Sequence, residues 1–224
     1  AAVPAQAQEA PVTESPRTSF LEIKFGSFRP RIDREFGDGP GPYAQFFGDR
    51  SMLMAEIEYD RQFFQAFGSA ALGLSVAYAE VYAPTTFASS GEASGERAGF
   101  RVIPLKLLAV YRFDVLAQRA RIPLVPYAKA SLQYVPWKAM KATGTECSGD
   151  VCGSGARWGY GGALGVALQL DFLDGRMARD FDAGVGVNHS YFFAEYNASQ
   201  VTNFGDPGLN LSGRYWLFGL GLEF

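Results

Sequence analysis

Residues 215–224, YWLFGLGLEF, decide the fold, because large apolar side chains occur at every second position. One face of the stretch carries Trp216, Phe218, Leu220, Leu222 and Phe224, and the other carries Leu217, Gly219, Gly221 and Glu223. A period of two residues is the signature of a β-strand with one apolar face. The stretch is therefore predicted to be a strand that ends on an aromatic residue.

The composition of the 224 residues points in the same direction. Glycine accounts for 26 residues and aromatic residues for 15%, whereas charged residues make up only 19%, below the usual ~25%. The net charge is −3 and no long basic run occurs, so nucleic acid is not expected as a partner. The longest uncharged stretch, residues 62–79, contains glutamine, serine and glycine, which makes it a poor membrane helix. A membrane protein of this composition has to cross with strands.

The alternation recurs in seven further segments, near residues 20–28, 52–61, 69–82, 100–113, 124–137, 158–172 and 183–196. The connectors between them alternate in length: long ones near 30–51, 83–99, 138–157 and 197–210, and short ones near 62–68, 114–122 and 173–181. Sorted loops of this kind are typical of a closed barrel in a membrane. The prediction is an all-β, eight-stranded antiparallel up-and-down transmembrane β-barrel with short periplasmic turns and four long extracellular loops.

Residue size indicates which face of each strand looks inward. The apolar faces carry large aliphatic residues throughout, and eight such faces would overfill an eight-stranded barrel. The opposite faces combine glycine and alanine with charged residues, which can pack together in a narrow lumen. We expect a lumen charge network of Glu56, Glu58, Asp60, Lys106, Arg112, Lys129, Asp171 and Glu195. A soluble lipocalin-like barrel is the alternative, but it explains neither the sorted loops nor the terminal Phe224.

The two ends of the chain suggest export and assembly. Residues 1–18 are rich in alanine, glutamine and proline, and Ala5-Gln6-Ala7 resembles the end of a secretory signal peptide. We expect a flexible N-terminal segment over 1–18, with a signal-peptide remnant, and the barrel over 19–224. Gly219, Leu222 and Phe224 resemble the pattern that the barrel assembly machinery of the bacterial outer membrane reads in a last strand, although Leu217 stands where that pattern usually has a polar residue. Both termini are then expected in the periplasm.

Four segments carry a resemblance to a known family: residues 103–134, IPLKLLAVYRFDVLAQRARIPLVPYAKASLQY, residues 165–174, GVALQLDFLD, residues 186–196, GVNHSYFFAEY, and the terminal strand. They resemble a family of small outer-membrane β-barrel proteins known mainly from myxobacterial genomes, and more distantly the OmpX-, OmpA- and OmpW-type barrels. The resemblance implies a fold and a location in the bacterial outer membrane. It brings no catalytic residues with it.

Two cysteines lie in the third long connector. Cys147 and Cys152, with a single histidine in the chain, cannot complete a four-ligand zinc site. An oxidising cell envelope favours a disulfide between them, with two free thiols as the alternative. No metal or cofactor site is predicted.

The one enzymatic candidate is the segment around His189, Ser190 and Glu195, which is similar to the histidine, serine and glutamate of an outer-membrane lipid A deacylase. Neighbouring residues of a strand point to opposite faces, so His189 and Ser190 diverge. His189 and Glu195 share a face but stand roughly 20 Å apart along an extended strand. This geometry disfavours a triad, which needs its members within hydrogen-bond reach.

The sequence as a whole favours a structural or interaction role in the cell envelope, as a loop-displaying scaffold or as a subunit of an envelope complex. The charged lumen is expected to be plugged. A narrow solute channel and a lipid-modifying enzyme are the alternatives, and a leak through the acidic lumen would favour cations. Expected partners are outer-membrane lipids and lipopolysaccharide, the assembly machinery, and an envelope protein bound at the extracellular loops or the periplasmic rim.

Overall fold

The computed structural model describes residues 17–37, 39–86, 93–120, 122–141, 144–145, 147–148, 151–171 and 186–224. The elements are β1 (Ser19–Phe28), η1 (Ile32–Glu35), α1 (Pro42–Phe47), β2 (Met52–Gln65), β3 (Ser69–Thr86), β4 (Ala93–Val102), β5 (Leu105–Arg112), α2 (Val115–Ala120), β6 (Leu124–Lys141), β7 (Gly144–Thr145), β8 (Cys147–Ser148), β9 (Val151–Cys152), β10 (Ser154–Gln169), β11 (His189–Val201), η2 (Asn203–Gly205) and β12 (Gly213–Glu223). The expected leader, apart from its last two residues, lies outside the described residues.

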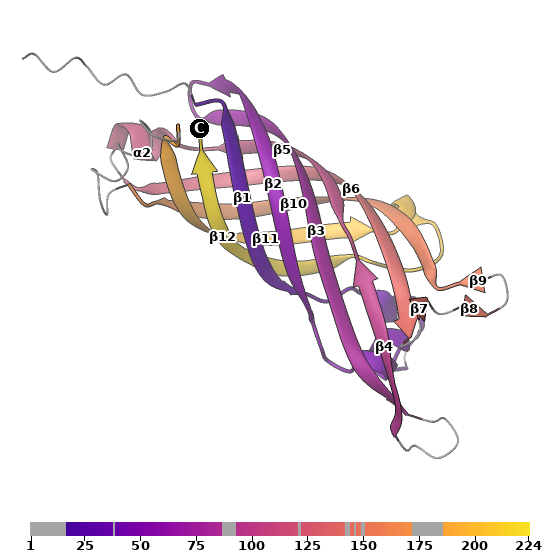
Figure 1. Ribbon diagram of the computed structural model, residues 1–224. Coiled ribbons are helices and arrows are strands. Elements are labelled where there is room, and N and C mark those ends of the chain that lie inside the picture. Colours follow the sequence, from indigo (N-terminus) through magenta and orange to yellow (C-terminus); the bar gives the residue numbers. More distant parts are fainter. Residues whose placement is uncertain are drawn as a thin grey trace, which may run out of the picture.

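The strands close into a ring of eight antiparallel positions (Figure 1). Each strand pairs with its neighbour in sequence, β1 closes the ring on β12, and β4 and β5 together fill the single position between β3 and β6. Closure leaves no long unpaired edge among the described strands. The up-and-down eight-stranded barrel predicted from the alternation is therefore confirmed.

One predicted strand, residues 100–113, is interrupted by Pro104. Proline has no backbone N–H for the ladder, and pairing stops at Val102 and resumes at Leu105. The inward and outward alternation continues across the break, because Val102 and Lys106 are both buried and Leu105 and Leu107 are both exposed. The break thus divides the strand into β4 and β5 without turning either face.

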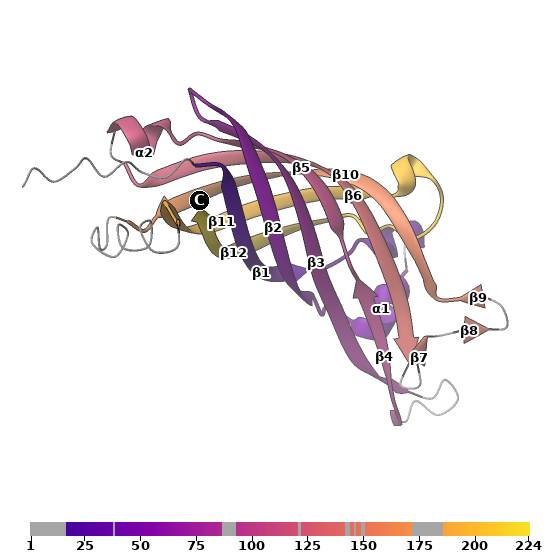
Figure 2. The ribbon, with the colours of Figure 1, turned by 45° about the horizontal axis from the view of Figure 1, so that its top comes forward.

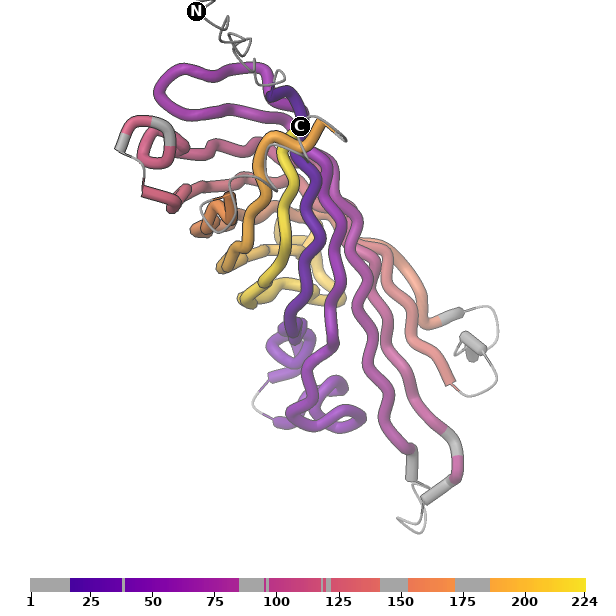
Figure 3. Tube along the Cα trace, turned by 60° about the vertical axis from the view of Figure 1, so that its left-hand side comes forward, coloured from indigo at the N-terminus to yellow at the C-terminus, as the bar shows by residue number. Residues whose placement is uncertain are grey.

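The two ends of the barrel differ in their connectors. At the short-connector end, β1 begins and β12 ends side by side: the N–H groups of Thr18 and Ser19 both donate to the Phe224 carbonyl oxygen. Helix α2 lies at this end, and Figure 3 shows the two strand ends meeting there. At the opposite, long-connector end the strands run further than predicted, since β3 continues to Thr86 and β10 begins at Ser154.

The outer surface of the barrel is apolar and the inner surface is polar at mid-height. Along β2 the inward Glu56, Glu58 and Asp60 are at most 1% exposed, whereas Leu53 and Ile57 on the other face are 74% and 52% exposed. This is the reverse of the burial found in a soluble domain. The predicted orientation of the strand faces is thus confirmed.

The interior is filled in three layers. Aromatic and aliphatic side chains close the long-connector end, among them Phe28, Met52, Met54, Phe100, Tyr215 and Leu217. A second apolar cluster closes the short-connector end, with Phe20, Val125, Tyr127, Ala167, Tyr191 and Phe193. Charged side chains occupy the level between them. Trp137 of β6 packs inward against Phe100, with ring centroids 6.0 Å apart.

The first long connector is part of this filling. Its helix α1 lies at the long-connector end (Figure 2), where Ile32, Tyr43 and Phe47 are buried in the apolar cluster of that end. Asp33 fixes the start of the helix by accepting hydrogen bonds from the N–H groups of Tyr43 and Ala44 at 2.8 and 3.2 Å. Burial raises the pKa of Tyr43 to about 12. The connector therefore folds into the barrel mouth.

Candidate functional site

A charge network fills the middle of the barrel. It consists of Glu22, Lys24, Glu56, Glu58, Asp60, Lys106, Arg112, Lys129 and Glu195, and we call this set the lumen network. Every one of these side chains is at most 6% exposed. Strands β1, β2, β5, β6 and β11 supply them, so the network ties together strands from around the ring.

Lys24 is the hub of the lumen network. Its Nζ lies 3.2 Å from a Glu22 oxygen, 3.4 Å from Glu56 and 3.6 Å from Glu195, and it also donates to Glu58. The register of β1 against β2 creates this arrangement, because it places Lys24 directly opposite Glu56 and Glu22 opposite Glu58. A buried ammonium ion needs such compensation, since its transfer out of water costs several kcal/mol.

The remaining three cations complete the pairing. Lys106 donates to Glu56 at 2.6 Å, Lys129 to Glu22 at 2.6 Å, and Arg112 to Glu22 at 2.9 Å. Arg112 also donates to Asp60, and Lys129 lies 3.1 Å from Glu195. Five carboxylates thus face four cations, so the network carries a formal charge of about −1 if all groups are ionised.

Small residues make room for these large side chains, as the sequence suggested. Gly73 faces Asp60, and a Cβ added at Gly73 would overlap an Asp60 carboxylate oxygen. Gly165 faces the Tyr127 ring in the same way. At these positions a glycine leaves the space that a bulky side chain of the neighbouring strand fills.

The alternation in the sequence predicts most of the lumen network but not its centre. Seven of the eight predicted residues come together: Glu56, Glu58, Asp60, Lys106, Arg112, Lys129 and Glu195. Glu22 and Lys24 were missing from the prediction. The signal for them was present, because both lie on the polar face of β1, opposite Leu21, Ile23 and Phe25.

Asp171 is the predicted member that lies elsewhere. It follows β10 at the short-connector end, where its carboxylate contacts His189 Nδ1 and accepts a hydrogen bond of 2.7 Å from Gln169. Burial acts to raise the pKa of Asp171, but the hydrogen bonds from His189 and Gln169 outweigh it and hold the pKa below its usual value. Asp171 therefore belongs to a separate pair with His189 at the rim.

The enzymatic candidates do not converge. His189 pairs with Asp171 at the end of the barrel, whereas Glu195 sits in the lumen network and accepts a hydrogen bond from Asn197. Six residues of extended strand, roughly 20 Å, separate them. The backbone N–H of Ser190 donates to Asp171 at 3.3 Å. The structure thus places His189 beside Asp171 and away from Glu195.

The predicted assembly signal lies at the seam of the ring. Gly219 and Leu222 are in β12, paired with Lys24 and Leu21 of β1, and the Phe224 N–H donates to the Ser19 carbonyl oxygen at 2.9 Å. A Cβ at Gly219 would overlap the Ile23 carbonyl oxygen and meet the Phe193 ring. Glycine at this position therefore serves close packing of the seam.

The two cysteines lie in a separate small hairpin. Within the described part of the chain, strands β8 and β9 pair only with each other, with Cys147 opposite Cys152. Directly opposed residues of an antiparallel pair have Cα atoms about 4.5–5.5 Å apart, which a disulfide can span. The side chains of both cysteines lie outside the described residues, and the disulfide stays a prediction.

Among the described residues, one group of acidic side chains has the spacing of a cation site: Glu22, Glu58 and Asp60, with oxygens within 4.8 Å of one another. Each of these carboxylates already contacts an ammonium or guanidinium group of the lumen network. Side-chain cations thus hold the position that a metal would take.

No described helix is both long and apolar enough to cross a bilayer.

A closed ring of eight strands with an apolar outer face and a charged lumen defines a β-barrel of the outer-membrane type. No family model matches the sequence, and no curated protein matches it. Among solved structures, the chain is similar to the outer membrane protein OprG from Pseudomonas aeruginosa, with a TM-score of 0.50 and 12% identity over 94% of this chain and 97% of that chain.

A second similar structure is that of Neisserial surface protein A, with a TM-score of 0.48 and 13% identity over 92% of this chain and 96% of that chain. A third is Ail, the attachment invasion locus protein of Yersinia pestis, with a TM-score of 0.47 and 11% identity over 95% of this chain and 100% of that chain. At 12% identity the likeness to OprG shows the fold alone. The chain therefore has the fold of the small outer-membrane barrels.

Proposed function

We propose that the protein is an integral outer-membrane β-barrel with a structural or interaction role, and that its lumen is closed. The observation that carries this proposal is that apolar side chains are exposed and charged side chains are buried, the reverse of a soluble domain. Leu53, Leu74 and Leu164 point outward and are 65–74% exposed, while Glu58 and Asp60 point inward and are fully buried. An apolar belt around a whole barrel is stable only when a nonaqueous phase covers it.

The same proposal includes the orientation of the barrel in the membrane and the family to which the chain belongs. Both barrel ends of the chain lie at the short-connector end, which we assign to the periplasm, because short turns face the periplasm in such barrels. Residues 103–134, 165–174 and 186–196 and the terminal strand, which resemble the myxobacterial family of small outer-membrane barrels, support membership in that family. We further propose that Gly219, Leu222 and Phe224 engage the assembly machinery, and that an envelope protein binds at the long connectors or the periplasmic rim.

The first experiment is refolding of the full chain into phospholipid vesicles, followed by electrophoresis with and without boiling. A folded barrel runs differently from the boiled chain and withstands protease in the vesicles. A chain that stays monomeric and folded in buffer without detergent would contradict the proposal.

A closed lumen distinguishes a scaffold from a channel. Three filled layers lie along the axis, and the lumen network joins strands on opposite sides. We expect no stepwise conductance in planar bilayers. A steady open channel would favour the channel reading, and it should then prefer cations because carboxylates outnumber lysine and arginine in the network.

We also propose that the protein is not an enzyme. The separation of His189 from Glu195 supports this, because a nucleophile needs its base within hydrogen-bond reach. The test compares lipid A from cells with and without the protein by mass spectrometry. An unchanged profile is expected, and the loss of an acyl chain in the presence of the protein would establish a lipid-modifying hydrolase instead.

A further inference from the structure

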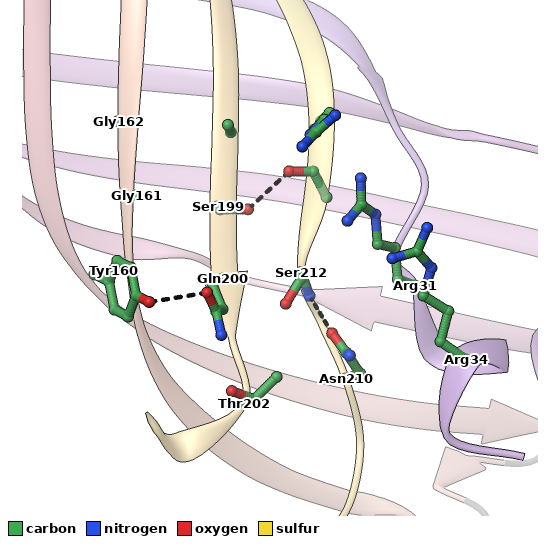
Figure 4. A pocket seen from close by; sticks show the side chains of 13 residues that line it. Arg31, Arg34, Tyr160, Gly161, Gly162, Ser199, Gln200, Thr202, Asn210 and Ser212 are labelled. Atoms are coloured by element: carbon green, nitrogen blue, oxygen red, sulfur yellow. Dashed lines mark hydrogen bonds between the residues drawn. The ribbon is translucent and has the colours of Figure 1, made fainter. Parts of the chain in front are cut away.

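An arginine-rich pocket lies on the outer surface near the long-connector end. Its volume is about 470 Å³, and Arg31, Arg34 and Arg214 line it together with Tyr160, Gln200 and Asn210. We call it the arginine pocket. Figure 4 shows Arg31 and Arg34 on one side of it, with Tyr160 hydrogen-bonded to Gln200 on the other.

The floor of the arginine pocket is made of small residues. Gly162 of β10 pairs with Ala198 of β11, which pairs in turn with Arg214 of β12. Ala198 and Arg214 are exposed on the outer face, so the hollow opens sideways from the barrel. A row without bulky side chains leaves space beside the Arg214 guanidinium.

The three arginines have no carboxylate within 4.0 Å among the described residues. The acidic neighbours are engaged elsewhere: Asp33 holds the N–H groups of α1, and Glu35 accepts a hydrogen bond of 2.8 Å from Asn210. The pKa of Arg31 is lowered by burial and by repulsion from Arg34 and Arg214. Three cations thus converge on one hollow, and no carboxylate of the described residues forms an ion pair with them.

The height of the pocket along the barrel identifies what it faces. Tyr196 and Trp216 form an outward aromatic pair, with ring centroids 5.2 Å apart. Ala198 and Arg214 are each two residues beyond this pair, or about 7 Å further along the strands. Tyrosine and tryptophan mark the boundary between hydrocarbon and headgroups. The arginines therefore lie at the level of lipid headgroups.

We propose that the arginine pocket binds a phosphate group of an outer-leaflet lipid, the phosphorylated headgroup of lipopolysaccharide. Guanidinium groups bind phosphate through paired, charge-assisted hydrogen bonds. Tyr160, Gln200 and Asn210 add polar groups suited to the adjoining sugars. This inference rests on the proposed outer-membrane location and deepens it, since it assigns the lipid contact to named residues.

The test uses the full chain refolded in detergent and two lipopolysaccharide samples, one intact and one with its lipid A phosphates removed. The test variant carries Arg31→Gln, Arg34→Gln and Arg214→Gln. The control variant carries the same charge change at exposed positions outside the pocket, Arg61→Gln, Arg119→Gln and Lys138→Gln. Binding is followed by tryptophan fluorescence, and inorganic pyrophosphate is titrated separately as the free anion.

Intact lipopolysaccharide is expected to bind the wild type and the control alike, and the test variant at least about tenfold more weakly, because each charge-assisted hydrogen bond is worth on the order of one factor of ten. Removal of the phosphates should weaken wild-type binding similarly. Equal binding by all three proteins, or undiminished binding of the dephosphorylated sample, overturns the site. Tighter binding of pyrophosphate than of lipopolysaccharide overturns the lipid source.

Vesicle insertion of the same three proteins is measured beside the binding. If all three proteins insert but bind lipopolysaccharide equally well, the proposed phosphate site is wrong while the proposed outer-membrane barrel stands. If the wild type does not insert, the proposed outer-membrane location itself fails.

Discussion

The lumen network and the arginine pocket differ in whether their cationic side chains are buried and paired with carboxylates. In the lumen, Lys24 contacts four carboxylates and is 1% exposed. In the pocket, Arg34 and Arg214 are exposed and have no carboxylate within 4.0 Å in the described part of the chain. Paired buried charge fills and ties the barrel, whereas unpaired surface charge is available to a ligand. The location of a cation therefore tells more about its role than its type does.

The largest contrast is expected between Lys24→Met and Arg214→Met. Loss of Lys24 leaves several buried carboxylates without their common partner, which should cost about 3–5 kcal/mol of unfolding free energy. Loss of Arg214 removes an unpaired surface charge and should change stability by less than about 0.5 kcal/mol. Urea unfolding in vesicles measures both. Similar losses in the two variants would remove the distinction between the two regions.

A charge placed on the outer face tests how deep the arginine pocket lies. Leu74→Arg puts a guanidinium into the apolar belt and should cost about 2–4 kcal/mol in a bilayer. Gln200→Arg adds the same group to the lining of the arginine pocket, at headgroup level, and should cost at most about 1 kcal/mol. The comparison is made by vesicle refolding at several urea concentrations. Equal costs would show that the two positions do not differ in lipid depth.

The packing of the lumen can be probed without changing charge. Gly165→Leu introduces a side chain against the buried Tyr127 ring and should cost about 1–3 kcal/mol, the range of overpacking. Ala130→Leu is the matched change on the outer face of β6, where the residue is exposed, and it should leave stability unchanged or slightly higher. A larger loss from Ala130→Leu would reverse the assignment of the two faces.

The smallest effect is expected from the hairpin of β8 and β9, which pairs with neither charged region. Replacing Cys147 and Cys152 by serine should lower the free energy of unfolding by at most about 2 kcal/mol, because the loop that the disulfide closes is short. Mass spectrometry of the unreduced native protein should show two cysteines that resist alkylation. Complete alkylation without a reductant would rule out the disulfide.

The alternation along each strand was sufficient to predict the ring and the orientation of its faces. Successive side chains of a strand point to opposite faces of the sheet. Leu74 could therefore be assigned to the apolar outer face of its strand, and Asp60 to the polar inner face of the neighbouring strand. Lys24 could not be identified as the hub, since its contact with Glu56 depends on the register between β1 and β2. Registers come from pairing across the whole ring, and no single segment contains them.

The connectors were harder to interpret for a related reason. Tyr43 and Phe47 stand in a segment without strand periodicity, and only its folding onto the barrel mouth shows that they are buried. The arginine pocket combines Arg31 and Arg34 with Arg214 from the last strand, so no local motif announces it. Asp171 and His189 are likewise brought together only by the pairing of β10 with β11.

The central claim is that the apolar face of the barrel meets lipid while the charged face is sealed inside. Spin labels at Leu74 and Leu220, in a background with Cys147→Ser and Cys152→Ser, test it in refolded vesicles, with Asp206 in an exposed connector as the aqueous reference. Labels at Leu74 and Leu220 should be open to molecular oxygen and closed to a water-soluble nickel complex, and the label at Asp206 should show the opposite. If the nickel complex reaches Leu74 as readily as Asp206, the face meets water and the account is wrong.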